Sequence, residues 1–199
     1  MAGRLGTHDR ASERVKHFHE PGDLHELTFS CYRRMQLLTN DLWRGMLAES
    51  IDRAMETCRF RLVAFVFMPE HVHLLVDPLE PQPELDRLLF AIIRPFSYRI
   101  KKLLESNGSP LLERLTIRER PGKTTFRFWQ AGPGYDRNLS TEQAVLAAID
   151  YLHLNPIRRG LVAEARLWRR SSSRWYESDG QHHDAALPPI HQLREGFFT

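Results

Sequence analysis

The 199-residue sequence has only two cysteines and no long apolar run, and each absence excludes a class of protein. Cys31 and Cys58 lie in or beside apolar segments, where a thiol usually behaves as a small buried side chain. Neither a disulfide framework nor a cysteine zinc site is therefore predicted. No segment reaches the ~18 apolar residues needed to span a bilayer, and the N-terminus lacks the apolar core of a signal peptide. We expect a cytoplasmic, soluble protein with no membrane partner.

The composition is that of one globular domain, without internal repeats. Hydrophobic residues make up 42% of the chain and charged residues 27%, and the net charge is only +3. A pI of about 9.1 favours a nucleic-acid partner without establishing one. The length suits one core of ordinary size. We predict a polar N-terminal tail over residues 1–22, a single catalytic domain over 23–176 and a C-terminal tail over 177–199.

The hydrophobic pattern predicts strands and helices in alternation. Strands are expected at Leu24–Tyr32, Phe60–Met68 and His71–Val76, the last two joined by the turn Pro69–Glu70. One helix is expected to begin at Asp41, which could cap it. A second helix is expected over Leu85–Leu104, where Pro95 must kink or split it. A basic excursion covers Leu111–Thr125, and a short fourth strand starts at Phe126–Trp129 and runs toward Tyr135.

A last helix is predicted near the C-terminus. It begins at Ser140 with a capping box, in which the Gln143 side chain reaches back to Ser140. It ends near Leu154, because Pro156 disfavours helical geometry at Asn155. The resulting order predicts an α+β fold. We expect a ferredoxin-like (split βαβ) four-stranded antiparallel sheet with helices on one face and an added C-terminal helix.

Two histidines on the third predicted strand could hold a metal ion. Side chains two residues apart on a strand point the same way, about 7 Å apart along the backbone, so His71 and His73 share one face. Val72 and Leu74 face the other way, where a helix would pack and hold the strand rigid. A lone His-x-His pair is common outside metal sites, so the pair needs support from a second motif.

That second motif lies on the last predicted helix. Val145, Ile149 and Leu152 form its apolar stripe, which places Tyr151 and Asn155 together on a different face because they are four residues apart. A phenol and an amide oxygen would then lie side by side. The same pattern would also arise from a structural tyrosine at the edge of a helix that ends at an asparagine.

The motifs together resemble a known family. The segments are Pro69-Glu70-His71-Val72-His73-Leu74-Leu75, then Phe128-Trp129-Gln130, then Tyr151 to Val162, with Trp168 and Ser171-Ser172 beyond them. In this order they resemble the REP-associated tyrosine transposases, single-strand transposases of the HUH nuclease superfamily. The likeness covers roughly residues 24–176. Residues 131–137 and the excursion over Leu111–Thr125 depart from the family pattern and concern the choice of DNA hairpin.

The resemblance implies an activity, a cofactor and a partner. His71 and His73 would bind a divalent metal, Mg²⁺ or Mn²⁺, Asn155 would supply the third ligand, and Tyr151 would be the nucleophile. The chain would be a metal-dependent endonuclease and strand transferase that cleaves single-stranded DNA near a hairpin through a 5′-phosphotyrosine. It would act as a monomer or a homodimer. His153 is either a donor to the metal ligands or a surface histidine, and Glu70 is assigned to the turn.

Cations with interleaved aromatic residues are the candidate DNA contacts. The predicted DNA-binding residues are Arg94, Arg99, Lys101 and Lys102 on the second helix and Arg158 and Arg159 beyond the nucleophile. The basic excursion adds Arg114, Arg118, Arg120 and Lys123, which could follow phosphates.

Two other functions stay open at this stage. A co-opted transposase could keep the fold and bind nucleic acid without catalysis. A metal-dependent hydrolase could use the histidines to activate water, with Tyr151 only structural. A relaxase or replication initiator would use similar chemistry, but such proteins usually carry these motifs in another order.

Overall fold

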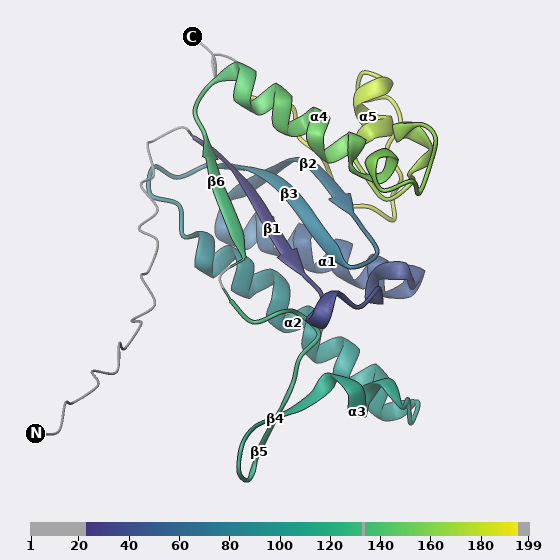
Figure 1. Ribbon diagram of the computed structural model, residues 1–199. Coiled ribbons are helices and arrows are strands. Elements are labelled where there is room, and N and C mark those ends of the chain that lie inside the picture. The colour runs from purple at the N-terminus through teal and green to yellow at the C-terminus, as the bar shows by residue number, and fades with distance from the viewer. Residues whose placement is uncertain (1–22, 133, 195–199) are drawn as a thin grey trace, which may run out of the picture.

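The computed structural model describes residues 23–132 and 134–194. The predicted N-terminal tail over residues 1–22 lies outside the described residues. A four-stranded sheet and three long helices form the centre of the fold (Figure 1). The strands are β1 (Leu24–Ser30), β2 (Phe60–Phe67), β3 (His71–Pro78) and β6 (Tyr135–Leu139), and the long helices are α1 (Asp41–Cys58), α2 (Leu85–Ser106) and α4 (Glu142–Arg158).

The strands lie in the order β2-β3-β1-β6, and all three neighbouring pairs are antiparallel. This order and the alternation of strands and helices confirm the predicted ferredoxin-like fold. The shorter elements are the 3-10 helices η1 (Tyr32–Arg34), η2 (Leu37–Thr39) and η3 (Ala165–Leu167), the helices α3 (Leu111–Leu115) and α5 (Ser173–Glu177), and the strands β4 (Thr116–Arg120) and β5 (Lys123–Phe126).

Helices cover both faces of the sheet, so β1, β2 and β3 are largely buried on both sides, whereas the edge strand β6 is partly exposed. On one face, α1 and α2 pack against a core that includes Val72 and Leu74 of β3. On the other face, α4 packs through Val145, Ala148 and Leu152 against a second apolar cluster. In Figure 1, α4 and α5 lie above the sheet, and α1 and α2 lie below it.

Two prolines that were expected to interrupt helices lie within them. Helix α2 continues through Pro95 and α4 continues through Pro156, beyond the predicted end at Leu154. A proline removes only one helical hydrogen bond, and burial of the apolar side chains on both sides of it can stabilise the helix. Ile92 and Phe96 flank Pro95 and are fully buried, and Leu152 is fully buried one turn before Pro156.

The predicted helix caps are each wrong by one residue. Asn40, not Asp41, caps α1, because its side chain accepts a hydrogen bond from Trp43 N at 3.1 Å. Thr141, not Ser140, caps α4 and accepts from Ala144 N at 3.2 Å. A run of two capping residues leaves this choice open in the sequence, since either can accept the bond.

The fourth strand of the sheet is β6, not the segment that starts at Phe126–Trp129. Phe126 ends β5 of a separate two-stranded sheet, and Trp129 makes a single bridge to Cys31. Phe128 and Trp129 are buried beside Phe96 of α2, with ring centroids 4.8 and 5.4 Å from that ring. Their aromatic side chains therefore belong to the hydrophobic core, and the segment is not the fourth strand of the sheet.

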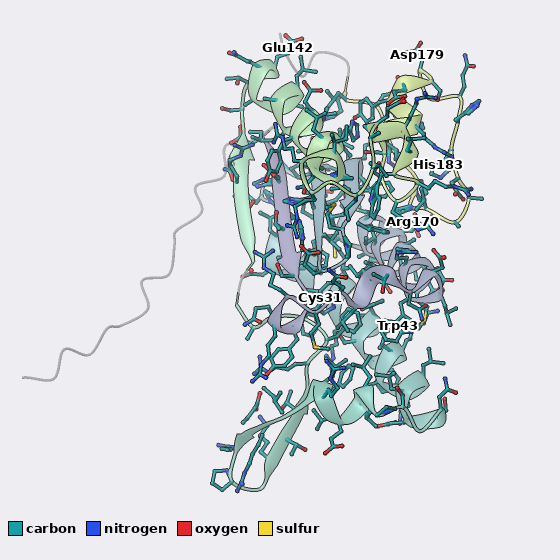
Figure 2. The ribbon with its side chains drawn as sticks, turned by 45° about the vertical axis from the view of Figure 1, so that its right-hand side comes forward. Cys31, Trp43, Glu142, Arg170, Asp179 and His183 are labelled. Atoms are coloured by element: carbon teal, nitrogen blue, oxygen red, sulfur yellow. The ribbon has the colours of Figure 1, made fainter. Side chains whose placement is uncertain are left out.

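Among the described residues, no strand pairs with the outer edge of β2, and this edge is covered by residues 168–191, the C-terminal segment. An unpaired edge exposes backbone groups that can pair with another chain. The covering bonds are Trp168 Nε1 to Phe67 O (3.1 Å), Phe67 N to Arg170 O (2.8 Å), Ser172 N to Phe65 O (3.0 Å), Tyr176 Oη to Val63 O (3.0 Å) and His191 N to Leu62 O (2.8 Å). Arg170, labelled in Figure 2, also pairs with Asp41 of α1.

Ser172 joins this edge to helix α4. Its fully buried hydroxyl accepts from Phe65 N at 3.0 Å, donates to Phe65 O at 3.2 Å and lies 2.8 Å from His153 Nε2. With its one proton used, the hydroxyl oxygen accepts from the imidazole. Burial lowers the pKa of His153 to about 4, so the ring is neutral at neutral pH and can donate from Nε2.

We predict that Ser172→Ala lowers the free energy of unfolding by about 1–3 kcal/mol, because it leaves Phe65 N and His153 Nε2 buried without their acceptor. Urea denaturation followed by circular dichroism measures the change. Ser106→Ala is the control, because Ser106 is exposed and its hydroxyl donates to Leu103 O of its own helix, and it should stay within about 0.5 kcal/mol. Equal midpoints for the two variants would contradict the prediction.

Candidate metal and nucleophile site

The two histidines of β3 face one another beneath α4. Their side chains leave the sheet on the same face, and the Nε2 atoms of His71 and His73 are 3.1 Å apart. Val72 and Leu74 point into the α1–α2 core and are fully buried. The predicted alternation is therefore present, and the packed core behind β3 holds the two imidazoles in register.

Each histidine has a carboxylate behind its Nδ1 atom. Glu70 Oε1 lies 3.1 Å from Nδ1 of His71, and Glu26 Oε1 lies 3.7 Å from Nδ1 of His73. Thr28 Oγ1 is closer still to His73 Nδ1, at 2.8 Å. A carboxylate or hydroxyl at Nδ1 fixes the ring orientation and leaves Nε2 free to bind a metal.

The protonation state of His71 follows from this setting. Burial, and secondly the charge of His73, lower the pKa of His71 to about 4, so the ring carries one proton at neutral pH. Because the carboxylate of Glu70 can only accept, that proton lies on Nδ1 and the lone pair on Nε2. The lone pair faces His73 Nε2 at 3.1 Å, so a cation placed between the two nitrogens could be bound by both rings.

Asn155 reaches the histidines from α4. Its Nδ2 atom lies 3.3 Å from His73 Nε2, and the residue is buried. The continuation of α4 through Pro156 keeps Asn155 in the helix and aimed at the sheet. Rotation of the amide by 180° places Oδ1 at the same point, so the side chain can offer an oxygen ligand there.

Tyr151 lies one helical turn before Asn155. Its ring is 5.8 Å from the ring of His73 at an angle of 83°, and the residue is 42% exposed. The guanidinium of Arg158 lies 5.1 Å from the centroid of the same ring. The phenol is thus beside the histidine pair and open to solvent, which is the combination that a nucleophile toward a large substrate requires.

Three residues around the histidines were not predicted to take part. Glu70 was assigned to the turn, but it is buried, contacts His71 and forms an ion pair with Arg159 at 2.7 Å. Glu26 and Thr28 contact His73 from β1, and Glu26 also pairs with Arg137 at 2.8 Å. Alternation shows that Glu26 and Thr28 share a face, but the pairing of Thr28 with His73 depends on strand register, which the sequence does not reveal.

The predicted DNA-binding cations divide into two groups. Arg158 and Arg159 lie at the site, where they contact Tyr151 and Glu70. The cations of α2 lie on the other side of the sheet, so the structure does not bring them to the histidines. Arg99 pairs with Glu49 (2.8 Å), Lys101 and Lys102 pair with Glu105 (3.6 and 2.8 Å), and Arg94 lies over Phe90 at 5.1 Å.

His153 is buried, and its contacts among the described residues are not with the candidate metal ligands. Its ring lies 5.2 Å from the ring of Tyr176 and bonds Ser172, within the contact between α4 and the C-terminal segment.

In the described part of the chain, no group of three or more His, Cys, Asp or Glu side chains is arranged to hold a metal ion. A site at His71 and His73 therefore needs the amide of Asn155 or ligands from outside the protein.

Comparison with known proteins finds a related family and a related fold. Residues 24–108 match the family described as transposase, IS200-like. Among solved structures, a REP-associated tyrosine transposase bound to a REP hairpin is 18% identical with a TM-score of 0.64, over 91% of this chain and 100% of that one. A candidate transposase from Deinococcus radiodurans R1 is also 18% identical, with a TM-score of 0.44 over 73% of this chain and 96% of that one. No curated protein sequence matches.

The predicted resemblance to the single-strand transposases is confirmed. More particularly, the chain is similar in fold to a REP-associated tyrosine transposase. The family match includes His71 and His73 but ends before Tyr151 and Asn155, so the place of these two residues in the site rests on the geometry above. Within the described residues, no helix is long and apolar enough to cross a membrane.

We predict that Glu70→Gln weakens the binding of Mn²⁺ by about 10- to 100-fold, because the loss of a carboxylate behind a ligating histidine lowers its basicity. Isothermal titration calorimetry on the metal-free protein measures the dissociation constant. Glu80→Gln serves as the control, since Glu80 is exposed and pairs with Arg59 away from the site. Unchanged Mn²⁺ affinity in Glu70→Gln would show that this carboxylate does not support a metal site.

Proposed function

We propose that the protein is a metal-dependent endonuclease and strand transferase that cleaves single-stranded DNA near a hairpin through a 5′-phosphotyrosine intermediate. The observation that carries this proposal is the meeting of Tyr151 and Asn155 from α4 with His71 and His73 from β3. All four groups come from one chain, so one copy provides a full set of candidate ligands and a nucleophile. We assign the activity to the predicted domain over residues 23–176.

The comparisons support the choice of substrate. The family matched by residues 24–108 is one of transposases, and the transposase with the same fold was solved with a REP hairpin. A hairpin with an adjoining single strand is therefore the first substrate to test. The exposed ring of Tyr151 is compatible with a strand that passes over the surface of α4.

The donor atoms fit a divalent cation such as Mn²⁺ or Mg²⁺. We expect His71 Nε2, His73 Nε2 and the amide oxygen of Asn155 to hold it, with other positions left for water and phosphate. When bound, such a cation withdraws charge from a phosphate oxygen and orients the phosphate for attack. Glu70 and Glu26 would hold the two imidazoles in the ligating orientation.

The chain itself supplies the nucleophile. In the proposed reaction Tyr151 Oη attacks the scissile phosphorus, the bond from phosphorus to the 3′ oxygen breaks, and the phenolic proton is transferred to solvent while the leaving oxygen takes one up. The products are DNA joined by its 5′ phosphate to Tyr151 and a free 3′ hydroxyl. Because one ester replaces another, a 3′ hydroxyl can later attack the phosphotyrosine and rejoin DNA without ATP.

Arg158 is placed to assist Tyr151. Its guanidinium lies 5.1 Å from the phenol ring centroid, so it can hold the ring and meet a phosphate beside the scissile bond. Arg159 has a different role, since it forms an ion pair with the buried carboxylate of Glu70 at 2.7 Å and holds that carboxylate in place behind His71.

We predict that the wild-type protein, mixed with Mn²⁺ and labelled single-stranded DNA that carries a hairpin, yields a DNA–protein adduct that resists denaturation. Tyr151→Phe should abolish the adduct, because a phenyl ring has no nucleophilic oxygen. EDTA should abolish it because the phosphate loses the cation that withdraws its charge. Denaturing gel electrophoresis separates the adduct from free DNA.

Tyr98→Phe is the matched control for the tyrosine, since Tyr98 is exposed on α2 and should keep the adduct. Cleavage that survives in Tyr151→Phe without any adduct would replace the proposal by metal-dependent hydrolysis. If the protein binds hairpin DNA in the presence of Mn²⁺ but gives neither an adduct nor cleavage, it is a nucleic-acid-binding module without catalytic activity.

A further inference from the structure

A basic arm projects from the end of the fold and takes no part in the site described above. It consists of α3, β4 and β5, residues 111–127, and its two strands form a sheet of their own. Figure 1 shows the β4–β5 hairpin extending away from the four-stranded sheet and all three long helices. Pro121 and Gly122 form the tip, where Gly122 has a φ of +77° that favours glycine.

The arm carries excess positive charge that its own carboxylates do not neutralise. It contains five cations and two carboxylates, an excess of three, as large as the net charge of the whole chain. Glu119 binds Lys123 at 2.9 Å and Arg127 at 2.7 Å, and these hydrogen bonds lower its pKa to about 2. Across residues 23–132 and 134–194, no carboxylate pairs with Arg114, Arg118 or Arg120, and all three are exposed.

The base of the arm is fixed to the end of the sheet that bears the histidines. Ser30, the last residue of β1, lies opposite His71 of β3. The next residue, Cys31, bridges Trp129, and Tyr32 N donates to Phe128 O at 2.8 Å. Figure 2 labels Cys31 at this end of the sheet, directly above the arm. DNA held at His71 that continues past the end of β1 therefore runs toward the arm.

We propose that this arm binds the duplex stem of the hairpin, with the β4–β5 ribbon in the major groove and Arg118 and Arg120 on its phosphates. The inference rests on the proposed function, since it supposes a hairpin beside the cleaved strand. The major groove of B-form DNA is about 12 Å wide and admits a two-stranded ribbon, whereas that of A-form RNA is too deep and narrow for side chains to read. A five-residue strand spans about 17 Å, enough to follow several base pairs.

The same features disfavour a second copy of the chain as the partner. Pairing of two arms along their free edges would bring the unpaired arginines of both copies together, and like charges on edge strands oppose such pairing. Duplex DNA offers the opposite charge, one phosphate per ~1.7 Å of helix axis. The proposal therefore gives the arm a duplex-binding role, distinct from the strand-cleaving role of α4.

The test compares a DNA hairpin with an unpaired DNA strand of the same length, both labelled with fluorescein, by fluorescence anisotropy at several salt concentrations. EDTA and the Tyr151→Phe background remove metal and covalent chemistry, so failure of the cleavage mechanism does not affect the result. Arg118→Gln with Arg120→Gln should weaken hairpin binding by about tenfold at moderate salt and reduce the slope of log K against log salt by about two.

Affinity for the unpaired strand and the melting temperature should stay unchanged in this double variant. Arg53→Gln with Arg87→Gln, two exposed arginines on α1 and α2, is the matched control and should bind the hairpin as the wild type does. An RNA hairpin of the same sequence should bind more weakly than the DNA hairpin and show little effect of the arm variant.

Three results would overturn the proposal. The first is a wild-type protein that binds the hairpin no better than the unpaired strand. The second is a double variant whose affinity falls equally for the hairpin and the unpaired strand, or falls for neither of them. The third is a dimer, measured by light scattering, that the arm substitutions dissociate, because this would assign the arm to a second copy of the chain.

Discussion

The packing of α4 on the sheet is the contact on which the proposed site depends. Val145, Ala148 and Leu152 bury the inner face of the helix against the strands, and this burial fixes both its position and its rotation about its axis. Asn155 then lies over His73, while Tyr151, one turn earlier, lies beside the same ring. A small rotation of α4 would separate all its polar groups from β3, whereas the two histidines would stay together because they share a strand.

Electrostatic compensation allows these polar groups to be buried. Glu70 and Glu26 lie almost wholly inside the protein, where an unpaired carboxylate would be costly. Each has an arginine within 2.8 Å and a histidine on its other side. Arg159 follows the last residue of α4, so its ion pair with Glu70 also joins this helix to the turn before β3. The polar layer between sheet and helix thus holds the same elements together as the apolar contacts do.

Local patterns in the sequence were sufficient for the order of elements and for the histidine pair, because alternation on a strand needs no tertiary information. They were insufficient wherever distant packing decides the outcome. Pro156 was expected to end α4 early, and only the burial of its neighbours shows why the helix continues. Thr28 could not be assigned to His73, since strand register joins residues 45 positions apart. On α2, three of the four cations that suggested DNA contacts, Arg99, Lys101 and Lys102, pair with Glu49 or Glu105, which the basic pattern alone does not show.

The cover on the edge of β2 has a consequence for when the site becomes complete. Ser172 joins Phe65 to His153 of α4, across 107 and 19 residues of sequence. A nascent chain that has emerged only as far as Arg158 contains Tyr151 and both histidines but lacks this contact, and its outer strand is still open to pairing. The same C-terminal segment covers the edge of that strand and contacts α4. Tyr151, the candidate nucleophile, therefore gains this second support for its helix only after synthesis has passed the segment that also covers the edge of the sheet.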